Sequence, residues 1–310
     1  MAKIAFMFPG QGSQYVGMGK SFYDNFPCAR AVFDEADRVL GRGIAALCFD
    51  GPEDALKDTR NAQPAIFTAS VAAWRVLTAE GIKPDYVAGH SLGEYSALVA
   101  SGALTFAEAL RLIQRRAQLM ADADPERQGT MAAVLGMDRA TLGGILEAMN
   151  AFGKVEAANY NCPGQIVISG EKTVIAEAQE AIKARGGKVI PLSVSGPFHS
   201  SLMQTAATAF RPELQASHWQ DPAIPLIANV SAQPVAGSDL ADSLYRQIFS
   251  PVLWEDTLRF LFDNGVSVFV EIGPGKVLTG LAKKTLKEVT LLNCEDSESL
   301  KKALAILKEV

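Results

Sequence analysis

Apolar and polar residues follow two different periods along the first part of the chain. Short apolar runs at 3–8 and 86–88 are typical of strands buried on both faces. Apolar positions recur at helical spacing in three longer stretches, 22–40, 61–80 and 105–121. The last of these begins with Thr105, and Glu108 three residues later completes a capping box. Strands that alternate with helices in this way predict an α/β fold with a mainly parallel sheet.

The pattern changes after the polar, turn-forming segment 122–129. Beyond it the sequence predicts strands at 130–137, 155–160, 165–169 and 188–194, and helices at 138–150 and 171–184. Their order, β-α-β-β-α-β, is typical of a ferredoxin-like domain. We therefore predict that 128–196 is a small ferredoxin-like domain inserted into a larger, hydrolase-like α/β domain made of 1–127 and 197–310. The chain returns to the larger domain with strands at 224–229 and 266–271 and a helix at 277–286.

The strand at 86–88 leads into Gly89-His90-Ser91-Leu92-Gly93, a G-x-S-x-G pattern followed by a helical stretch at 94–100. A serine between a strand and a helix in this pattern predicts a nucleophile elbow, in which its hydroxyl is exposed on a tight turn. The glycines on either side let the strand and the helix approach closely. The N–H of Leu92 then lies at a helix N-terminus, where it is placed to stabilise an oxyanion. The alternative is a glycine-rich turn that carries an incidental serine.

A serine hydroxyl needs a base to become a good nucleophile, and His199 is the best candidate. It follows the last predicted strand of the inserted domain, and clefts form preferentially at such domain junctions. His90 adjoins the serine, so its side chain should point away from it and pack or hydrogen-bond locally. His218 lies in a polar stretch and should be a surface residue. The alternative for His199 is a buried histidine beside a turn.

Two further segments suggest anion binding. The glycine-rich loop 8–14 follows the first strand and can present backbone N–H groups to an anion. It lacks the Lys-Ser/Thr end of a phosphate-binding loop and the spacing of a dinucleotide motif, so a plain turn is the alternative. Arg115 and Arg116 point about 100° apart on their helix, and at most one of them faces the cleft. That guanidinium is suited to clamp a carboxylate, while a solvated helix face is the alternative.

Composition narrows the class of protein. The 310 residues allow about two domains, and 48% hydrophobic with 20% charged residues is typical of a soluble globular protein. The net charge of −5 gives no electrostatic reason to expect nucleic-acid or membrane binding. Four scattered cysteines and three histidines predict no metal site. Without a signal peptide or an apolar run of about 20 residues, we expect a cytoplasmic protein with reduced cysteines.

Several distinctive motifs occur together and in order along nearly the whole chain. They are PGQGSQ at 9–14, QPA at 63–65, AGHSLGEYSAL at 88–98, NYNCPGQIVISG at 159–170, GPFHS at 196–200 and EIGPGKVLTGL at 271–281. With these motifs the chain closely resembles the bacterial malonyl-CoA:acyl carrier protein transacylases. These are the acyltransferases of type II fatty acid synthesis, and they are related to the acyltransferase domains of polyketide synthases.

The resemblance implies a role for each residue of the site. Ser91 matches the nucleophile of the family and His199 its general base. The backbone N–H groups of Gln11 and Leu92 match the oxyanion hole, and Arg116 matches the arginine that pairs with the malonyl carboxylate. The family activity is a ping-pong transfer of malonyl from malonyl-CoA, through a malonyl-serine ester, to the phosphopantetheine thiol of holo acyl carrier protein. No cofactor is expected, and we further expect a monomer.

The resemblance also concerns residues around the reacting groups. No acidic partner for the histidine stands out. The family uses a backbone carbonyl, at the position of Gln247, and a carbonyl fixes the ring without a buried charge. Phe198 before the histidine and Leu92 after the serine are a combination that related domains selective for malonyl over methylmalonyl often show. One methyl group is worth only ~1–3 kcal/mol in such a pocket. Residues that resemble the lining of the family cleft are Gln63, Asn159 and Asn161.

Partner binding and two rival functions complete the expectations. The carrier proteins of this family are acidic, so a basic patch near the cleft is expected, with Lys276, Lys283 and Lys284 as candidates. The alternative for these lysines is a solvated helix face. The enzymatic rival is a serine esterase or thioesterase of α/β-hydrolase type, which needs an acidic residue and then a histidine after the serine. The other rival is a non-catalytic scaffold that binds a carrier protein.

Overall fold

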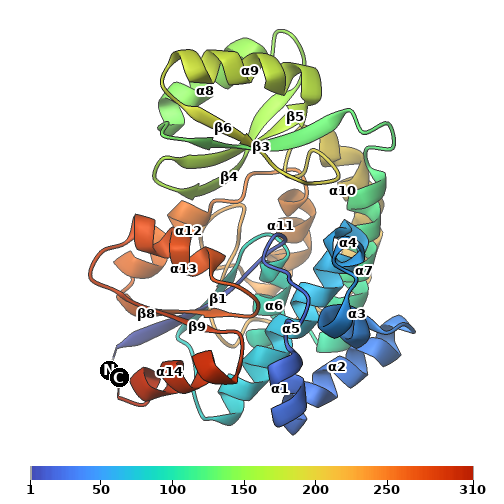
Figure 1. Ribbon diagram of the computed structural model, residues 1–310, viewed down its shortest axis with the longest axis vertical. Coiled ribbons are helices and arrows are strands. Elements are labelled where there is room, and N and C mark those ends of the chain that lie inside the picture. Colours follow the sequence, from blue (N-terminus) through green and yellow to red (C-terminus); the bar gives the residue numbers. More distant parts are fainter. Residues whose placement is uncertain (1, 310) are drawn as a thin grey trace.

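The structure is a computed structural model that describes residues 2–309. Its two sheets lie one above the other in Figure 1. The lower sheet has the strand order β7-β2-β1-β8-β9, and each neighbouring pair is parallel. Its strands are β1 Lys3–Phe8, β2 Tyr86–Gly89, β7 Leu226–Ile227, β8 Val266–Ile272 and β9 Thr290–Cys294. The predicted parallel sheet is therefore confirmed.

Helices cover both faces of the parallel sheet, and the central strand β1 shows why. Phe6 and Phe8 pack into one core cluster, whereas Ala5 and Met7 pack into another, because successive side chains on a strand point to opposite faces. The first cluster is formed with α2 Pro27–Leu40, α5 Thr59–Ala79, α6 Gly93–Ala100, α7 Phe106–Asp122 and α14 Ser297–Leu307. The second is formed with α12 Trp254–Asp263 and α13 Val277–Thr285.

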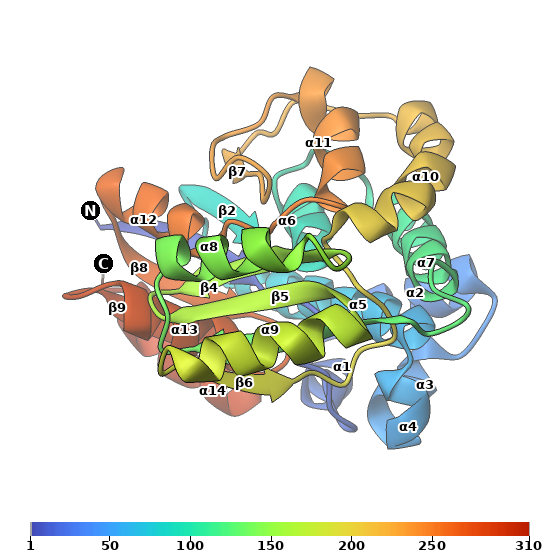
Figure 2. The same ribbon diagram turned by 90° about the horizontal axis from the view of Figure 1, so that it is seen from above.

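The upper sheet is antiparallel and has the order β4-β5-β3-β6. Its strands are β3 Gly129–Leu135, β4 Val155–Cys162, β5 Gln165–Glu171 and β6 Lys188–Pro191. Two helices, α8 Arg139–Met149 and α9 Lys172–Ala184, pack together on its outer face (Figure 2). The β-α-β-β-α-β order and the ferredoxin-like arrangement are confirmed, and a third core cluster fills the space between these helices and the sheet.

Further helices complete the fold. They are α1 Lys20–Asn25, α3 Ile44–Asp50, α4 Glu53–Lys57, α10 Gln204–Ala216, α11 Leu240–Gln247 and the 3-10 turns Ser201–Met203 and Gly237–Asp239. No helix within residues 2–309 combines the length and apolar composition that crossing a membrane would require.

The structure corrects several predicted elements. The single helix expected at 22–40 is two helices, α1 and α2, because Pro27 disfavours a helical conformation at Phe26, which is extended. The strand expected at 224–229 has ladder bonds only at Leu226–Ile227. The sequence analysis did not identify α10, whose interior contains Pro212, a residue that normally breaks a helix.

Candidate active site

The turn between β2 and α6 holds Ser91 in a strained conformation. Its φ is 52°, in the left-handed region that favours glycine. A Cβ added at Gly89 would lie 2.0 Å from the carbonyl of Gly93, and one added at Gly93 would lie 2.0 Å from the carbonyl oxygen of Phe8. Both positions therefore need glycine. The backbone N–H of Ser91 donates to Oδ1 of Asn229 at 2.7 Å, and this hydrogen bond also stabilises the turn.

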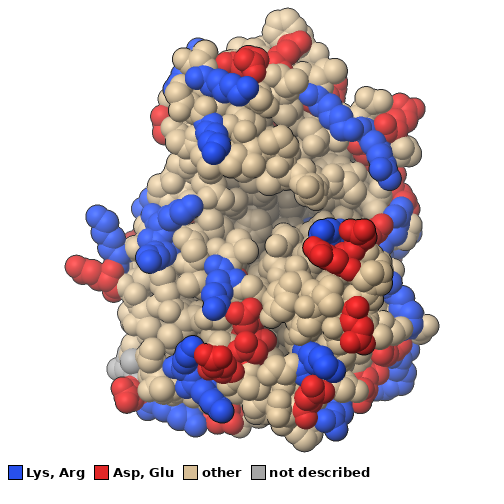
Figure 3. Space-filling view, in the orientation of Figure 1, with Lys and Arg blue, Asp and Glu red and all other residues tan. Residues whose placement is uncertain are grey.

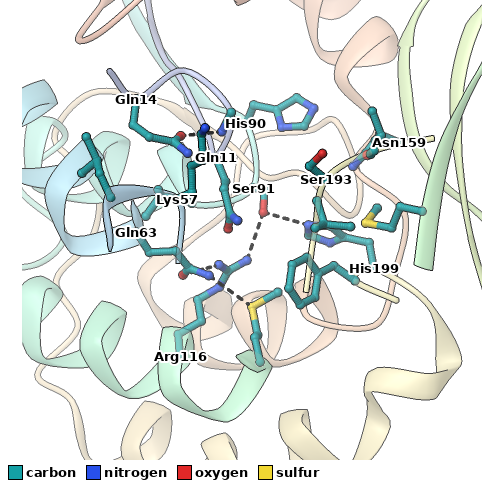
Figure 4. A pocket seen from close by; sticks show the side chains of 18 of the residues that line it. Gln11, Gln14, Lys57, Gln63, His90, Ser91, Arg116, Asn159, Ser193 and His199 are labelled. Atoms are coloured by element: carbon teal, nitrogen blue, oxygen red, sulfur yellow. Dashed lines mark hydrogen bonds between the residues drawn. The ribbon is translucent and has the colours of Figure 1, made fainter. Parts of the chain in front are cut away.

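His199 lies directly against the serine, as Figure 4 shows. Its Nε2 is 2.7 Å from Oγ of Ser91, and its Nδ1 is 2.8 Å from the backbone oxygen of Gln247. A carbonyl oxygen can only accept, so Nδ1 carries the proton and Nε2 is the acceptor for the serine hydroxyl. His199 is buried, and burial together with the positive charge of Arg116 lowers its pKa to about 3. The imidazole is therefore neutral and ready to accept a proton.

Arg116 approaches the same oxygen from α7. Its guanidinium donates from Nη2 to Oγ of Ser91 at 3.0 Å and to Oε1 of Gln247 at 2.9 Å, and from Nη1 to Oε1 of Gln63 at 2.7 Å. The side chain is 1% exposed, and burial lowers its pKa, although a guanidinium keeps its charge in proteins. Arg115 points outward and pairs with Glu213 on α10 at 2.8 Å. Of the two adjacent arginines, Arg116 is thus the one that faces the cleft.

These side chains line a cavity of about 410 Å³. The surface is hollowed between the two sheets, where charged side chains are sparse (Figure 3). The parallel-sheet side contributes Gln11, Gln63, Ser91, Leu92, Arg116 and His199, with Phe198 beside the histidine. The antiparallel-sheet side contributes Met131 of β3, Asn159 of β4 and the segment 192–194 after β6.

Two backbone N–H groups beside the serine are available to a ligand. Within residues 2–309, no hydrogen bond uses the N–H of Gln11 or of Leu92, and both residues line the cavity. A Cβ added at Gly10 would lie 2.5 Å from the carbonyl oxygen of His90, so the loop after β1 rests directly on the elbow. The Gln11 side chain donates to Oγ1 of Thr59 at 3.0 Å, which holds that loop in place. This arrangement can hold a tetrahedral oxyanion.

Comparison with known proteins decides the family. The chain matches the acyl transferase domain family over residues 5–304. It belongs to that family. The malonyl CoA-acyl carrier protein transacylase of Bacillus subtilis (strain 168) is 46% identical over 312 residues, which cover 100% of this chain and 98% of the relative.

Solved structures agree with this assignment. The crystal structure of the malonyl CoA-acyl carrier protein transacylase from Clostridium perfringens has a TM-score of 0.97 at 43% identity, and the match covers 99% of this chain and 98% of the other. A malonyl-transacylase in complex with its type II PKS acyl-carrier protein has a TM-score of 0.95 at 39% identity, covering 98% and 99%. Among acyl transferases, the chain is thus a member of the malonyl-CoA:acyl carrier protein transacylases.

One residue predicted to line this acyl transferase's cleft lies elsewhere. Asn159 lines the cavity, but Asn161 does not, and its Oδ1 lies 2.9 Å from Nε2 of His90. Substrate binding by Asn161 stays a prediction that this contact does not support. His90 also packs edge-on against Trp254, so it is held locally as expected. His218 is exposed and pairs with Glu108, as expected of a surface residue.

The three candidate lysines do not line the cavity either. Lys276 pairs with Glu295 at 3.5 Å, and Lys284 donates to Gln165 on β5 at 3.2 Å. Docking of a carrier protein on these lysines stays a prediction. Among residues 2–309, no group of three or more His, Cys, Asp or Glu side chains is arranged to hold a metal ion.

Sequence reasoning missed three parts of the site. Only the backbone carbonyl of Gln247 was expected to take part in the site. Its side chain also does, because Oε1 accepts from Arg116 and Nε2 donates to Oε2 of Glu94 at 2.7 Å. Glu94 is 1% exposed, and burial raises its pKa to about 7. Asn229 holds the elbow by accepting from Ser91 and donating to the Gly89 oxygen at 2.6 Å. The one sign of these contacts in the sequence was Glu94, an acidic residue inside the otherwise buried helix α6.

Proposed function

We propose that this chain transfers malonyl from malonyl-CoA to holo acyl carrier protein, with Ser91 as the carrier of the malonyl group. One observation supports the proposal above the others. Oγ of Ser91 lies 2.7 Å from Nε2 of His199 and 3.0 Å from Nη2 of Arg116. A nucleophile, a neutral base and a buried cation that suits a carboxylate thus converge on one atom.

The first half of the reaction forms a malonyl-serine ester. Nε2 of His199 takes the hydroxyl proton while Oγ of Ser91 attacks the thioester carbon. The N–H groups of Gln11 and Leu92 hold the resulting oxyanion. The intermediate then collapses, the C–S bond breaks, and the coenzyme A sulfur leaves with the proton from Nε2. Throughout, the carbonyl of Gln247 keeps Nδ1 protonated and the ring correctly oriented.

The second half reverses these steps with another thiol. The phosphopantetheine thiol of holo acyl carrier protein gives its proton to His199 and attacks the ester carbon. The C–O bond to Ser91 breaks, and Oγ recovers the proton. A carrier protein is a partner of the related malonyl-transacylase that was solved in complex with one. No step in either half calls for a cofactor.

Arg116 selects the acyl group in this proposal. A guanidinium binds a carboxylate through two parallel hydrogen bonds, and malonyl presents a free carboxylate whereas acetyl does not. Phe198 lines the same cavity and crowds a methyl group on the α-carbon. These two residues support malonyl as the preferred substrate.

We further propose the domain limits 128–196 for the insert and 1–127 with 197–310 for the catalytic domain, because the two sheets fall on either side of them. The monomer expected from the sequence stays a prediction. The four cysteines are free, which supports a reducing compartment such as the cytoplasm.

The test is the fate of the malonyl group. The protein is mixed with labelled malonyl-CoA, with and without holo acyl carrier protein, and malonyl carrier protein and free malonate are both quantified. We expect transfer to the carrier at least about 100-fold faster than release of malonate. Malonate released at the same rate in both mixtures would identify a hydrolase. Binding of the carrier without transfer or hydrolysis would identify a scaffold.

A further inference from the structure

Glu94 is a buried carboxyl that the proposed mechanism does not use. It lies in the first turn of α6, three residues after Ser91, and all eight residues of that helix are buried. A buried carboxyl is costly unless it is hydrogen-bonded, so its contacts are informative. Its Oε2 accepts from Nε2 of Gln247 at 2.7 Å and from the backbone N–H of Asn229 at 3.3 Å, whereas Oε1 has no partner within residues 2–309.

The carboxamide of Gln247 connects Glu94 to the catalytic groups. Its Nε2 donates to Glu94 and to the backbone oxygen of Ser91 at 3.0 Å, and its Oε1 accepts from Arg116 at 2.9 Å. If this carboxamide were flipped, its NH2 would face the guanidinium, which can only donate. Its oxygen would then face the Glu94 carboxyl and the Ser91 carbonyl, both acceptors. The acceptor on Glu94 therefore favours the orientation that holds Arg116.

We propose that Glu94 is a positioning residue for acyl selection: its Oε2 fixes the carboxamide of Gln247, which in turn holds the Arg116 guanidinium beside Ser91. The inference rests on the proposed role of Arg116 as the carboxylate clamp. The position of the acceptor matters here and not the negative charge. A proton on Glu94 would go to the unpartnered Oε1, and Oε2 would still accept from Gln247.

Two substitutions at Glu94 separate the effect of its hydrogen-bond acceptor from the effect of its negative charge. Glu94→Gln keeps an acceptor at the Oε2 position and removes the charge. Glu94→Asp keeps the charge and withdraws the acceptor by one methylene. The quantity measured is the ratio of kcat/KM for malonyl-CoA to kcat/KM for acetyl-CoA, because a loss of packing alone lowers both values together. We expect the ratio to stay within about threefold of wild type in Glu94→Gln and to fall about tenfold in Glu94→Asp.

Glu271 offers a matched control. It is another fully buried carboxylate, at the end of β8, and it accepts from the N–H groups of Leu278 at 3.0 Å and Thr279 at 2.7 Å. It has no contact with Gln247 or Arg116 among the hydrogen bonds of residues 2–309. Glu271→Asp should lower thermal stability and leave the malonyl-to-acetyl ratio unchanged.

Three results would overturn the inference. They are an unchanged ratio in a folded Glu94→Asp variant, an equal loss of ratio in Glu94→Gln and Glu94→Asp, or a loss of ratio in the Glu271→Asp control. If Glu94→Asp does not fold, Glu94→Met replaces it, since methionine has similar length and places a methyl group instead of an oxygen at the Oε2 position. Arg116→Ala, measured in parallel, keeps the two proposals distinct. If it lowers malonyl and acetyl use equally, the clamp itself is wrong. If it is malonyl-selective and Glu94→Asp is not, only the role of Glu94 is wrong.

Discussion

The two walls of the cavity differ in chemistry. The wall built on the parallel sheet carries Ser91, His199 and Arg116, joined by hydrogen bonds of 2.7 and 3.0 Å to one oxygen. The wall built on the antiparallel sheet is mostly apolar, with Met131 of β3 and Leu192 after β6 facing the site. The proposed reacting groups therefore come from one wall, and the other wall adds mostly apolar lining. Substitutions in the two walls should have different effects.

Topology explains this division. In a parallel sheet the carboxyl ends of the strands lie at one edge, where ligands bind in α/β proteins. The adjacent strands β1 and β2 end there in the Gln11 loop and the Ser91 elbow. The antiparallel sheet presents a face with its outer helices turned away (Figure 2), so it offers a lid rather than a cluster of backbone N–H groups.

The largest effect is expected on the catalytic wall at the base. His199→Asn should slow acylation by malonyl-CoA by about 1,000-fold, because the serine then has no general base. Asparagine is chosen because His199 has a φ of 57°, which asparagine tolerates better than alanine. Rapid-quench measurement of the acyl-enzyme checks this, with thermal unfolding as the control for folding. A loss of less than tenfold would show that another group takes the proton.

Arg116→Ala should have the next largest effect, and a selective one. Loss of a buried charged partner costs about 2–5 kcal/mol, so kcat/KM for malonyl-CoA should fall about 30-fold or more. Use of acetyl-CoA should fall far less, because acetyl has no carboxylate. Arg115→Ala is the matched control, since this neighbour pairs with Glu213 at the surface. Equal losses for both acyl groups would remove Arg116 from the clamp role.

A substitution in the apolar wall should be weaker and unselective. Leu192 is half-buried and lines the cavity after β6. Leu192→Ala removes apolar contact worth about 1 kcal/mol, and we expect kcat/KM to fall less than about tenfold for malonyl and acetyl alike. Steady-state kinetics with both substrates measure this. A selective loss for malonyl would show that the apolar wall also recognises the carboxylate and would undo the contrast between the walls.

The smallest effect is expected from pH. The pKa of His199 is lowered to about 3, so its neutral form prevails both near pH 7.5 and near pH 5.5. Acidification over this range therefore does not protonate the base. The Glu94 carboxyl titrates within it, with a pKa of about 7, but its Oε2 remains an acceptor. Acylation rates should change less than about threefold. A one-proton decline centred near pH 6.5 that persists in Glu94→Gln, where this carboxyl is absent, would show that His199 is solvated in the reacting state.

Local patterns were sufficient to predict much of this site. Five consecutive residues were enough to predict the elbow at Ser91. The position of His199 at a domain junction followed from the order of the predicted strands. The link between Glu94 and Gln247 was not predictable, because it joins residues 153 positions apart through one hydrogen bond. No period or motif encodes such a contact. It depends on how α11 packs beside the elbow.

The prediction of helices from the sequence was limited in a similar way. The first helical stretch was predicted as one helix because its apolar spacing continues across Phe26, although Pro27 opens a new helix there. The error in α10 was the opposite one. Pro212 argues against a helix in the sequence, but packing of Phe210 and Leu214 in the core maintains the helix. At Phe26 the local effect of Pro27 outweighs the apolar spacing, whereas in α10 tertiary contacts override the local propensity of proline.

The most direct test is intact-protein mass spectrometry of the wild-type protein and of Ser91→Ala after mixing with malonyl-CoA. We predict that the wild-type protein gains one malonyl group, that holo acyl carrier protein removes it, and that Ser91→Ala gains none while its thermal unfolding stays cooperative. A malonyl adduct on folded Ser91→Ala, or none on the wild-type protein, would contradict the assignment of Ser91 as the carrier of the malonyl group.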